Sequence, residues 1–289
     1  MTAFPHRSLY TIALPHGGTL ALGARPLVMG ILNVTPDSFG STPYARTDDA
    51  VAAGLRMQED GADLIDVGGE STRPGADPVP AEEELARVIP VVRALSARAR
   101  VPISVDTYKA EVARVAMAEG AAIVNDVSGL QYEPALGEVV AAAGAALVLM
   151  HNRGRSSRMY AEADYGDVAA DVARELNDRV ATAVAAGVAR ERLILDPGIG
   201  FAKRPEHSYG VLAGLPEIAA AVARPLLAGP SRKSFMNEAV GGRPALERDW
   251  GTAAAVTAAV LAGAHIVRVH HVAAMAQVVR VAEEIRRHA

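Results

Sequence analysis

The sequence predicts an α/β fold, a (β/α)8 TIM barrel with an N-terminal β-hairpin, and three features of the chain indicate it. Eight short aliphatic runs each end in a polar or charged residue. Helical patterning separates these runs, so strands and helices alternate along the chain. The length of 289 residues suits one barrel of about 250 residues with additions. A parallel barrel carries its chemistry at the C-terminal ends of its strands, so the functional site is expected there.

A β-hairpin is expected first. Residues 9–14 and 19–22 alternate in polarity around the turn signal His16-Gly17-Gly18. We expect this hairpin, within residues 1–26, to cap the closed end of the barrel. The chain has no linker or low-complexity segment, so residues 1–289 are interpreted as one barrel domain with residues 1–26 as its cap.

Eight strands follow, and each stops at a side chain that can bind a ligand. The polar ends, in chain order, are Asn33, Asp66, Asp106, Asn125 with Asp126, His151, Asp196, Lys233, and Arg268 with His270. Parallel strands would direct all of these groups to one end of the barrel.

Helices are predicted after the strands, and glycines mark several of their ends. Gly61, Gly120, Gly144 and Gly187 each follow a helical segment and precede a strand, where a left-handed residue ends a helix without Cβ strain. The predicted helices cover residues 47–60, 82–99, 110–119, 134–143, 168–186, 206–223 in two pieces, 248–262 and 272–289. The longest irregular stretches, residues 35–46, 68–80 and 152–164, directly follow strands, where a barrel has its functional loops.

The composition excludes several classes of function. The formal net charge of −4 gives no basic footprint for nucleic acid. The chain has no cysteine, which excludes disulfides, thiolate metal sites and a cysteine nucleophile. No apolar run approaches the roughly 18 residues of a membrane span, and the amino terminus lacks the apolar core of a signal peptide. A soluble cytoplasmic protein with no membrane partner is therefore expected.

Seven short motifs carry a family resemblance. They are GILNVTPDSF at 30–39, DVGGESTRPGA at 66–76, SVDT at 104–107, NDVSGL at 125–130, DPGIGF at 196–201, SRKS at 231–234 and RVH at 268–270. Together they resemble the dihydropteroate synthase family, in the family's order, from about residue 27 to the carboxyl end. The resemblance implies a homodimeric transferase of folate biosynthesis and a sulfonamide target. It would join 6-hydroxymethyl-7,8-dihydropterin pyrophosphate to p-aminobenzoate, releasing pyrophosphate and 7,8-dihydropteroate.

Three strand ends suit a pterin. The 2-amino-4-oxo edge of this flat heterocycle presents paired donors and acceptors, which carboxylates and amides can match. Asp106, Asn125 and Asp196 supply such groups from three strands whose burial fixes their backbones. By resemblance these three residues and Lys233 hold the pterin ring. Asp66 is expected at the ring or at the reacting end.

The last two strands suit pyrophosphate. Arg268 and His270 are two apart on a strand, so their side chains share a face, and an arginine fork can grip phosphate oxygens. Lys233 joins them after strands seven and eight, the usual phosphate site of a barrel. The resemblance adds Asn33 as the amide that helps to hold Mg²⁺ against pyrophosphate. The catalytic set is predicted to be Asp106, Lys233, Arg268 and His270.

The resemblance also implies a pocket for p-aminobenzoate. Its predicted residues are Thr72, Arg73, Pro74, Phe201, Ser231 and Lys233. Hydroxyls and backbone amides would bind the carboxylate, while proline and phenylalanine sandwich the ring.

Several residues have a plainer interpretation. An aspartate after a strand is often a turn former, and Arg268 could be a structural ion-pair residue. His151 is interpreted as a loop-orienting histidine rather than a base, whereas Lys203 either approaches the pterin or faces solvent. His271 should point away from His270.

The chain also departs from the family pattern, at residues 40–44 of the first loop, Tyr108, Ala202 and His271. Two alternative functions stay open. One is a barrel that transfers a methyl group from methyltetrahydrofolate to a corrinoid protein. The other is a noncatalytic paralogue that binds pterin.

Overall fold

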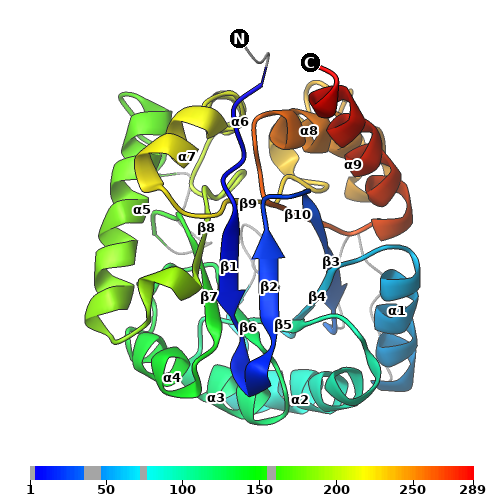
Figure 1. Ribbon diagram of the computed structural model, residues 1–289, viewed down its shortest axis with the longest axis vertical. Coiled ribbons are helices and arrows are strands. Elements are labelled where there is room, and N and C mark those ends of the chain that lie inside the picture. Colours follow the sequence, from blue (N-terminus) through cyan, green and yellow to red (C-terminus); the bar gives the residue numbers. More distant parts are fainter. Residues whose placement is uncertain (1–3, 36–46, 72–76, 155–160) are drawn as a thin grey trace.

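The computed structural model describes residues 4–35, 47–71, 77–154 and 161–289, and these form the predicted barrel. Eight parallel strands are ordered β8-β7-β6-β5-β4-β3-β10-β9. A parallel bridge between Leu195 and Leu226 joins the two ends of this order, with the Leu195 amide donating to the Pro225 carbonyl over 2.9 Å. Figure 1 shows the helices arranged around the strands and the hairpin lying across them. The predicted fold class is confirmed.

Each strand overlaps a predicted aliphatic run, but the prediction that the seventh strand ends at Lys233 was wrong: β9 ends at Ala228, and Lys233 lies in the segment after it. The bounds of the strands are β3 Leu27–Asn33, β4 Leu64–Gly68, β5 Ile103–Asp106, β6 Ile123–Asp126, β7 Ala146–Met150, β8 Leu193–Asp196, β9 Leu227–Ala228 and β10 Ile266–Val269. Neighbouring strands end level with one another, since Asp106 pairs with Gly68 on one side and with Asn125 on the other. The register therefore brings the polar strand ends to one rim.

The helices follow the strands as predicted. Their bounds are α1 Thr47–Glu59, α2 Ala81–Arg98, α3 Ala110–Ala118, α4 Ala135–Ala143, α5 Val168–Ala185, α6 Pro205–Ala213, α7 Leu215–Val222, α8 Asp249–Leu261 and α9 Val272–Arg287. The predicted last helix was too long, because α9 ends at Arg287. Gly144, with φ of 63°, closes α4 in the left-handed conformation that the sequence predicted for helix ends.

The hairpin covers the N-terminal end of the barrel. It consists of β1, Tyr10–Ala13, and β2, Thr19–Leu22, joined through a short 3₁₀ turn. Ile12 and Leu22 pack in one buried cluster with residues near the starts of the barrel strands, among them Leu64, Ile123 and Ile194. The apolar side of the hairpin therefore closes this end.

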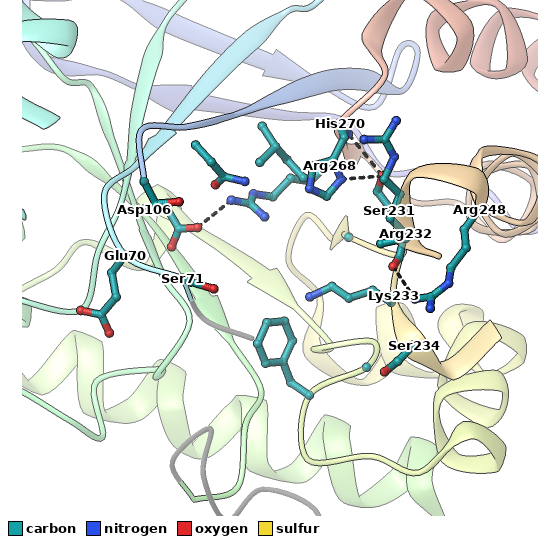
Figure 2. A pocket seen from close by; sticks show the side chains of 17 residues that line it. Glu70, Ser71, Asp106, Ser231, Arg232, Lys233, Ser234, Arg248, Arg268 and His270 are labelled. Atoms are coloured by element: carbon teal, nitrogen blue, oxygen red, sulfur yellow. Dashed lines mark hydrogen bonds and ion pairs between the residues drawn. The ribbon is translucent and has the colours of Figure 1, made fainter. Parts of the chain in front are cut away.

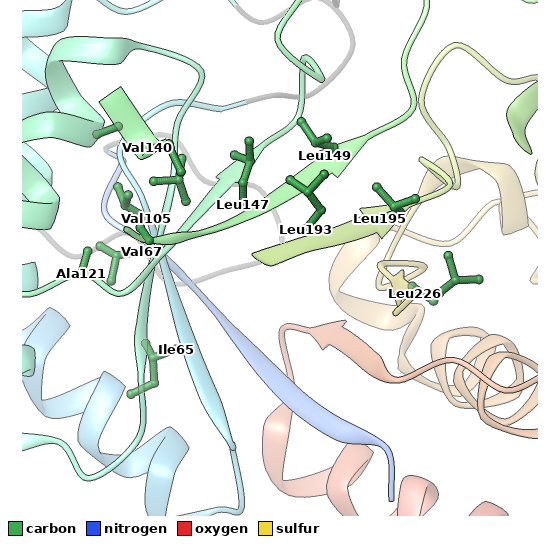
Figure 3. Close-up of a cluster of buried hydrophobic side chains, with 14 of the residues drawn as sticks. Ile65, Val67, Val105, Ala121, Val140, Leu147, Leu149, Leu193, Leu195 and Leu226 are labelled. Atoms are coloured by element: carbon green, nitrogen blue, oxygen red, sulfur yellow. The ribbon is translucent and has the colours of Figure 1, made fainter. Parts of the chain in front are cut away.

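Between the strands and the helices lies the largest apolar cluster. Strand residues such as Ile65, Val67, Leu147 and Leu149 face the helices, and Val140 of α4 packs with them (Figure 3). Because side chains alternate along a strand, the residues between them point into the barrel. This packing fixes the backbone that carries the inward polar groups. Among the described helices, none has the length and apolarity that a membrane span requires.

Candidate active site

A cavity of about 260 Å³ opens at the C-terminal ends of the strands. Its walls come from segments far apart in the chain, including β3, β5, β10 and the segments after β4, β8 and β9 (Figure 2). The predicted site residues on its walls are Asn33, Asp106, Phe201, Ser231, Lys233, Arg268 and His270. These predicted residues therefore lie together around one cavity at this rim.

Arg268 connects the two acidic strand ends of the site. Its Nε donates to Asp66 Oδ2 and its terminal nitrogen donates to Asp106 Oδ2, both over 2.6 Å. Asn125 Nδ2 also donates to Asp66 Oδ2, over 2.9 Å. Arg268 is therefore an ion-pair residue and a cavity residue at once, so its two interpretations are compatible. Asp66 and Asn125 are buried and do not line the cavity; Asp66 holds Arg268, and Asn125 holds Asp66.

The second oxygen of each carboxylate is unused. Asp66 Oδ1 and Asp106 Oδ1 are buried, and neither has a hydrogen-bond partner among the described residues. Burial raises the pKa of Asp106 to about 7, although the charge of Arg268 opposes this shift. An unsatisfied buried acceptor is costly, so Asp106 suits a ligand that brings hydrogen-bond donors.

Asp196 and Asp126 show the difference between a site residue and a turn former. Both oxygens of Asp126 accept backbone N–H groups, from Ser128 over 2.7 Å and from Leu130 over 2.6 Å. Among the described residues, Asp196 accepts one backbone N–H, from Gly198 over 2.7 Å. Asp196 is not itself on the cavity wall, but its other oxygen would lie 3.8 Å from a Cβ on Gly229, which is. Both oxygens of Asp126 therefore serve its turn, whereas the second oxygen of Asp196 lies near the cavity wall.

Cations and an aromatic ring form the opposite side of the cavity. Lys233 Nζ lies 3.6 Å from the centroid of the Phe201 ring. The Ser231 hydroxyl accepts the backbone N–H of His270 over 3.2 Å and lies 3.0 Å from its Nδ1 (Figure 2). The segment after β9 is thereby tied to the end of β10. This arrangement can bind an anion beside a flat ring.

The comparisons with known proteins agree with this geometry. A family model described as pterin binding enzyme matches residues 29–270. The dihydropteroate synthase of a Synechocystis strain is 46% identical over 276 residues, which cover 95% of each chain. The chain belongs to the dihydropteroate synthase family of pterin binding enzymes.

Solved structures of the family have the same fold. The Yersinia pestis dihydropteroate synthase, in a complex with a sulfonamide drug, gives a TM-score of 0.90 at 43% identity and covers 94% of this chain and 98% of its own. The Burkholderia cenocepacia dihydropteroate synthase, complexed with 7,8-dihydropteroate, gives 0.87 at 44% identity and covers 97% and 98%. The family assignment therefore extends over nearly the whole barrel.

Some predicted residues of this dihydropteroate synthase family member lie outside the described residues. These are Thr72, Arg73 and Pro74 of the expected p-aminobenzoate pocket and the altered first-loop residues 40–44. Three departures are described, and one of them, Ala202, is buried and has a positive φ of 46°. His271 Nδ1 lies 3.0 Å from Asp249 Oδ2 and away from the cavity wall, as expected from its position. Tyr108 donates its hydroxyl to Glu70 over 2.8 Å.

The sequence interpretation missed six polar residues of the cavity wall. They are Thr35, Glu70, Ser71, Arg232, Ser234 and Arg248. Glu70 and Ser71 belong to the GGES part of a family motif that directly follows β4, and this position was the available signal. Arg248 had no such signal, because it reaches the wall from the turn before α8, where its guanidinium donates to the Arg232 carbonyl over 3.2 Å.

The possible metal ligands near Asn33 determine which kind of metal ion this family member could hold. The described residues contain no cluster of three or more histidine, aspartate or glutamate side chains suited to a metal. Asn33 provides an amide at the end of β3, on the same wall as Arg268 and His270. One amide is too little for a metal held by protein alone. It does fit Mg²⁺, which keeps several waters and is usually bound through one or two protein groups plus substrate phosphates.

Proposed function

We propose that this barrel condenses 6-hydroxymethyl-7,8-dihydropterin pyrophosphate with p-aminobenzoate, forming 7,8-dihydropteroate and pyrophosphate in folate biosynthesis. The observation that carries the proposal is the division of one cavity into an acidic side and a cationic side. Asp106 presents a buried carboxylate oxygen that has no hydrogen-bond partner among the described residues, and Lys233 and His270 lie opposite. A pterin pyrophosphate has the complementary division, with a donor-rich ring at one end and an anion at the other.

The pterin ring is assigned to the acidic side. Asp106 and Asp196 accept from its ring and amino N–H groups, while Asn125 and Lys233 complete the expected set. Burial raises the pKa of Asp196, and the nearby charges of Lys233 and Arg268 lower it. The cations therefore help to keep the acceptors ionised. A charge-assisted bond of this kind contributes roughly 1.5–3 kcal/mol.

Pyrophosphate is assigned to Lys233, Arg268 and His270, with Asn33 as a ligand of Mg²⁺. When bound, the ion supplies Lewis-acid stabilisation of charge on the departing pyrophosphate. Arg268 is held by two carboxylates, so its fork is already oriented and little reorganisation is needed. The pKa of Arg268 is raised by Asp66 and Asp106, although burial opposes this, so its charge is permanent.

The bond changes follow from this placement. The C–O bond between the pterin methylene and pyrophosphate breaks first, and pyrophosphate takes the electron pair. The amine nitrogen of p-aminobenzoate then forms the C–N bond to the cation-like methylene and releases one proton to solvent or to pyrophosphate. Lys233 and Arg268 stabilise the developing negative charge. An aniline nitrogen is already a nucleophile, so the chemistry requires no strong base.

The p-aminobenzoate ring is assigned beside Phe201, with Ser231 and Lys233 near its carboxylate. Thr72, Arg73 and Pro74 complete the pocket in the proposal. The resemblance further supports a homodimer, and α8 and α9 carry exposed apolar side chains suited to an interface, Trp250, Val281 and Ile285. A cytoplasmic location remains a prediction.

The decisive experiment follows two products in one assay. The purified protein is given the pterin pyrophosphate, Mg²⁺ and p-aminobenzoate, and pyrophosphate and 7,8-dihydropteroate are measured together. We expect both to appear in equal amounts and the second only with p-aminobenzoate. A noncatalytic pterin-binding paralogue would bind the pterin and release no pyrophosphate. A corrinoid methyltransferase would form no pteroate, and it has no need of the SRK, RVH and STRPG motifs together.

A further inference from the structure

Lys203 is a buried lysine whose position no part of the proposed chemistry explains. Its side chain is among the largest fully buried ones, with only 1% of the residue exposed. Among the described residues, no carboxylate lies within ion-pair distance of it. Burying an ammonium group without such a partner is costly. Because Lys203 is buried, the interpretation that it faces solvent was wrong; it does not line the cavity, and its approach to the pterin stays a prediction.

The ammonium group is held by two acceptors. Nζ donates to the Phe201 carbonyl over 3.1 Å and lies 2.8 Å from His151 Nδ1. On the other side of the ring, His151 Nε2 lies 3.0 Å from Glu175 Oε2. An ammonium group can only donate, so Nδ1 accepts and Nε2 carries the proton that Glu175 receives. Burial and the charge of Lys203 lower the pKa of His151 to about 4, which keeps the ring neutral in this role.

These contacts support the segment that joins two residues of the proposed site. Asp196 and Phe201 stand at either end of a turn in which Gly198, Gly200 and Ala202 all have positive φ, 68°, 80° and 46°. The turn packs directly on β7, because a Cβ on Gly198 would lie 2.0 Å from the His151 carbonyl oxygen. Lys203 fastens the far end of this turn to the same histidine.

Lys203 also places charge behind Asp196. The groups that act on it are Asp196 from β8, Glu175 from α5, Arg153 from the segment after β7, and the Tyr165 ring, whose centroid lies 5.8 Å from Nζ. Burial lowers the pKa of Lys203 to about 7, while Asp196 and Glu175 raise it and Arg153 lowers it. Lys203 in turn is one of the charges that lower the pKa of Asp196.

We infer that Lys203 is a positioning residue for the pterin and p-aminobenzoate sites, fixing the turn between Asp196 and Phe201 and supplying positive charge behind Asp196. The inference rests on the proposed function of the cavity. Lys203 acts through its neighbours and contacts neither substrate. His151 contacts both Lys203 and Glu175 of α5, which agrees with its interpretation as an orienting residue.

The first test removes the charge of Lys203 and keeps a side chain of similar size. Binding of 6-hydroxymethylpterin is measured by calorimetry for the parent, for Lys203→Met, and for Arg204→Met, a neighbouring exposed cation, as the control. At about pH 6 the parent lysine is charged, and Lys203→Met should bind the pterin about tenfold more weakly. At about pH 8.5 the parent lysine is largely neutral, so the difference should shrink to about threefold. Arg204→Met should match the parent at both values.

A second variant, Glu175→Gln, tests the inference even if Lys203→Met does not fold. Glu175 does not line the cavity, and glutamine can still accept the proton from His151. Glu175→Gln removes a charge that raises the pKa of Lys203. We therefore expect the pterin affinity of Glu175→Gln, divided by that of the parent at the same pH, to fall as the pH rises from about 6 toward about 7.

The outcomes separate this inference from the proposed function. If the parent binds no 6-hydroxymethylpterin at any pH, the proposed function fails. If the parent binds it and Lys203→Met has the parent's affinity throughout, or a deficit that does not change with pH, the positioning role is overturned. Should Lys203→Met fail to fold, an unchanged pH response in Glu175→Gln overturns it instead.

Discussion

The two ends of the barrel are built from the same strands, and the inward-facing positions at the two ends lie two residues apart on each strand. Leu64, Ile123 and Ile194 point inward near the closed end and pack under the hairpin. Two positions later, on the same inward face, the residues are Asp66, Asn125 and Asp196. The strand geometry is the same at both ends. Whether an inward position belongs to the core or to the proposed site therefore depends only on the side chain at that position.

The consequences of the two ends differ. Apolar burial at the closed end stabilises the fold and requires no hydrogen-bond or ion-pair partner. At the open end the buried carboxylates need compensation, which Arg268 provides for Asp66 and Asp106. The oxygen of Asp106 without a hydrogen-bond partner in the described part of the chain is the one available to a ligand. Variants at each end should therefore alter different quantities.

The largest effect is expected at the closed end, in stability alone. Ile12 is fully buried under the barrel, so Ile12→Ala should lower the free energy of unfolding by about 2–5 kcal/mol. Thr11→Ala, on the exposed side of the same strand, is the matched control and should change it little. Urea denaturation measures this, with calorimetry of 6-hydroxymethylpterin as the second readout. A parallel loss of pterin affinity in Ile12→Ala would show that the two ends are not separable.

At the open end the effect should fall on binding. Asp106→Asn or Asp196→Asn should weaken pterin binding by about 1.5–3 kcal/mol for each charge-assisted bond, with the fold intact. Asp126→Asn is the control, because both of its oxygens serve backbone amides, so it should lower stability rather than affinity. Calorimetric titration with a pterin analogue decides the matter. Unchanged affinity in both site variants would remove Asp106 and Asp196 from the pocket.

The alternation of inward and outward side chains also explains which features of the fold and the proposed site could be predicted from the sequence. Inward and outward positions alternate along a strand, so the rim carrying Asn33, Asp106, Asp196 and Arg268 was predictable from the aliphatic runs alone. Glycine endings likewise located the helices. Contacts between side chains from distant segments were not predictable in this way.

Lys203 and Arg248 illustrate what the local pattern could not give. Lys203 follows a motif that suggested either the pterin or solvent, and only the structure shows that it is buried, with its Nζ 2.8 Å from Nδ1 of His151. Arg248 reaches the cavity through the chain reversal before α8. Such positions depend on tertiary packing, which neither periodicity nor motif spacing records.

A smaller, selective effect is expected from Asn33. If it helps to position Mg²⁺ on pyrophosphate, Asn33→Ala should raise the Mg²⁺ concentration for half-maximal turnover by about tenfold, the lower limit of typical losses around metal ligands. Binding of the bare pterin should be unchanged, since that ligand carries no phosphate. Turnover measured against Mg²⁺ concentration tests this. A curve superimposable on that of the parent would mean that Asn33 only organises the first loop.

The smallest effect is a pH dependence at Asp106. Burial raises its pKa to about 7 against the opposing charge of Arg268. Below that pH the carboxyl group is protonated and loses acceptor capacity. In a Lys203→Met background, which removes the opposing titration of Lys203, affinity for 6-hydroxymethylpterin should therefore rise as pH increases through this value. The rise should be absent when Asp106→Asn is added to that background. If that variant keeps the rising limb, another group must be responsible.

The most direct test of a single divided site is competition between a sulfonamide and p-aminobenzoate. Ser231 and Lys233 border both the anion and aromatic parts of the cavity, and Ser231 is hydrogen-bonded to His270. Pyrophosphate with Mg²⁺ at Lys233, Arg268 and His270 should therefore fix these groups before the aromatic ligand binds. We predict that the sulfonamide is competitive toward p-aminobenzoate and binds most tightly with pyrophosphate and Mg²⁺ present. Noncompetitive inhibition, or no inhibition at saturating pyrophosphate, would contradict the shared cavity.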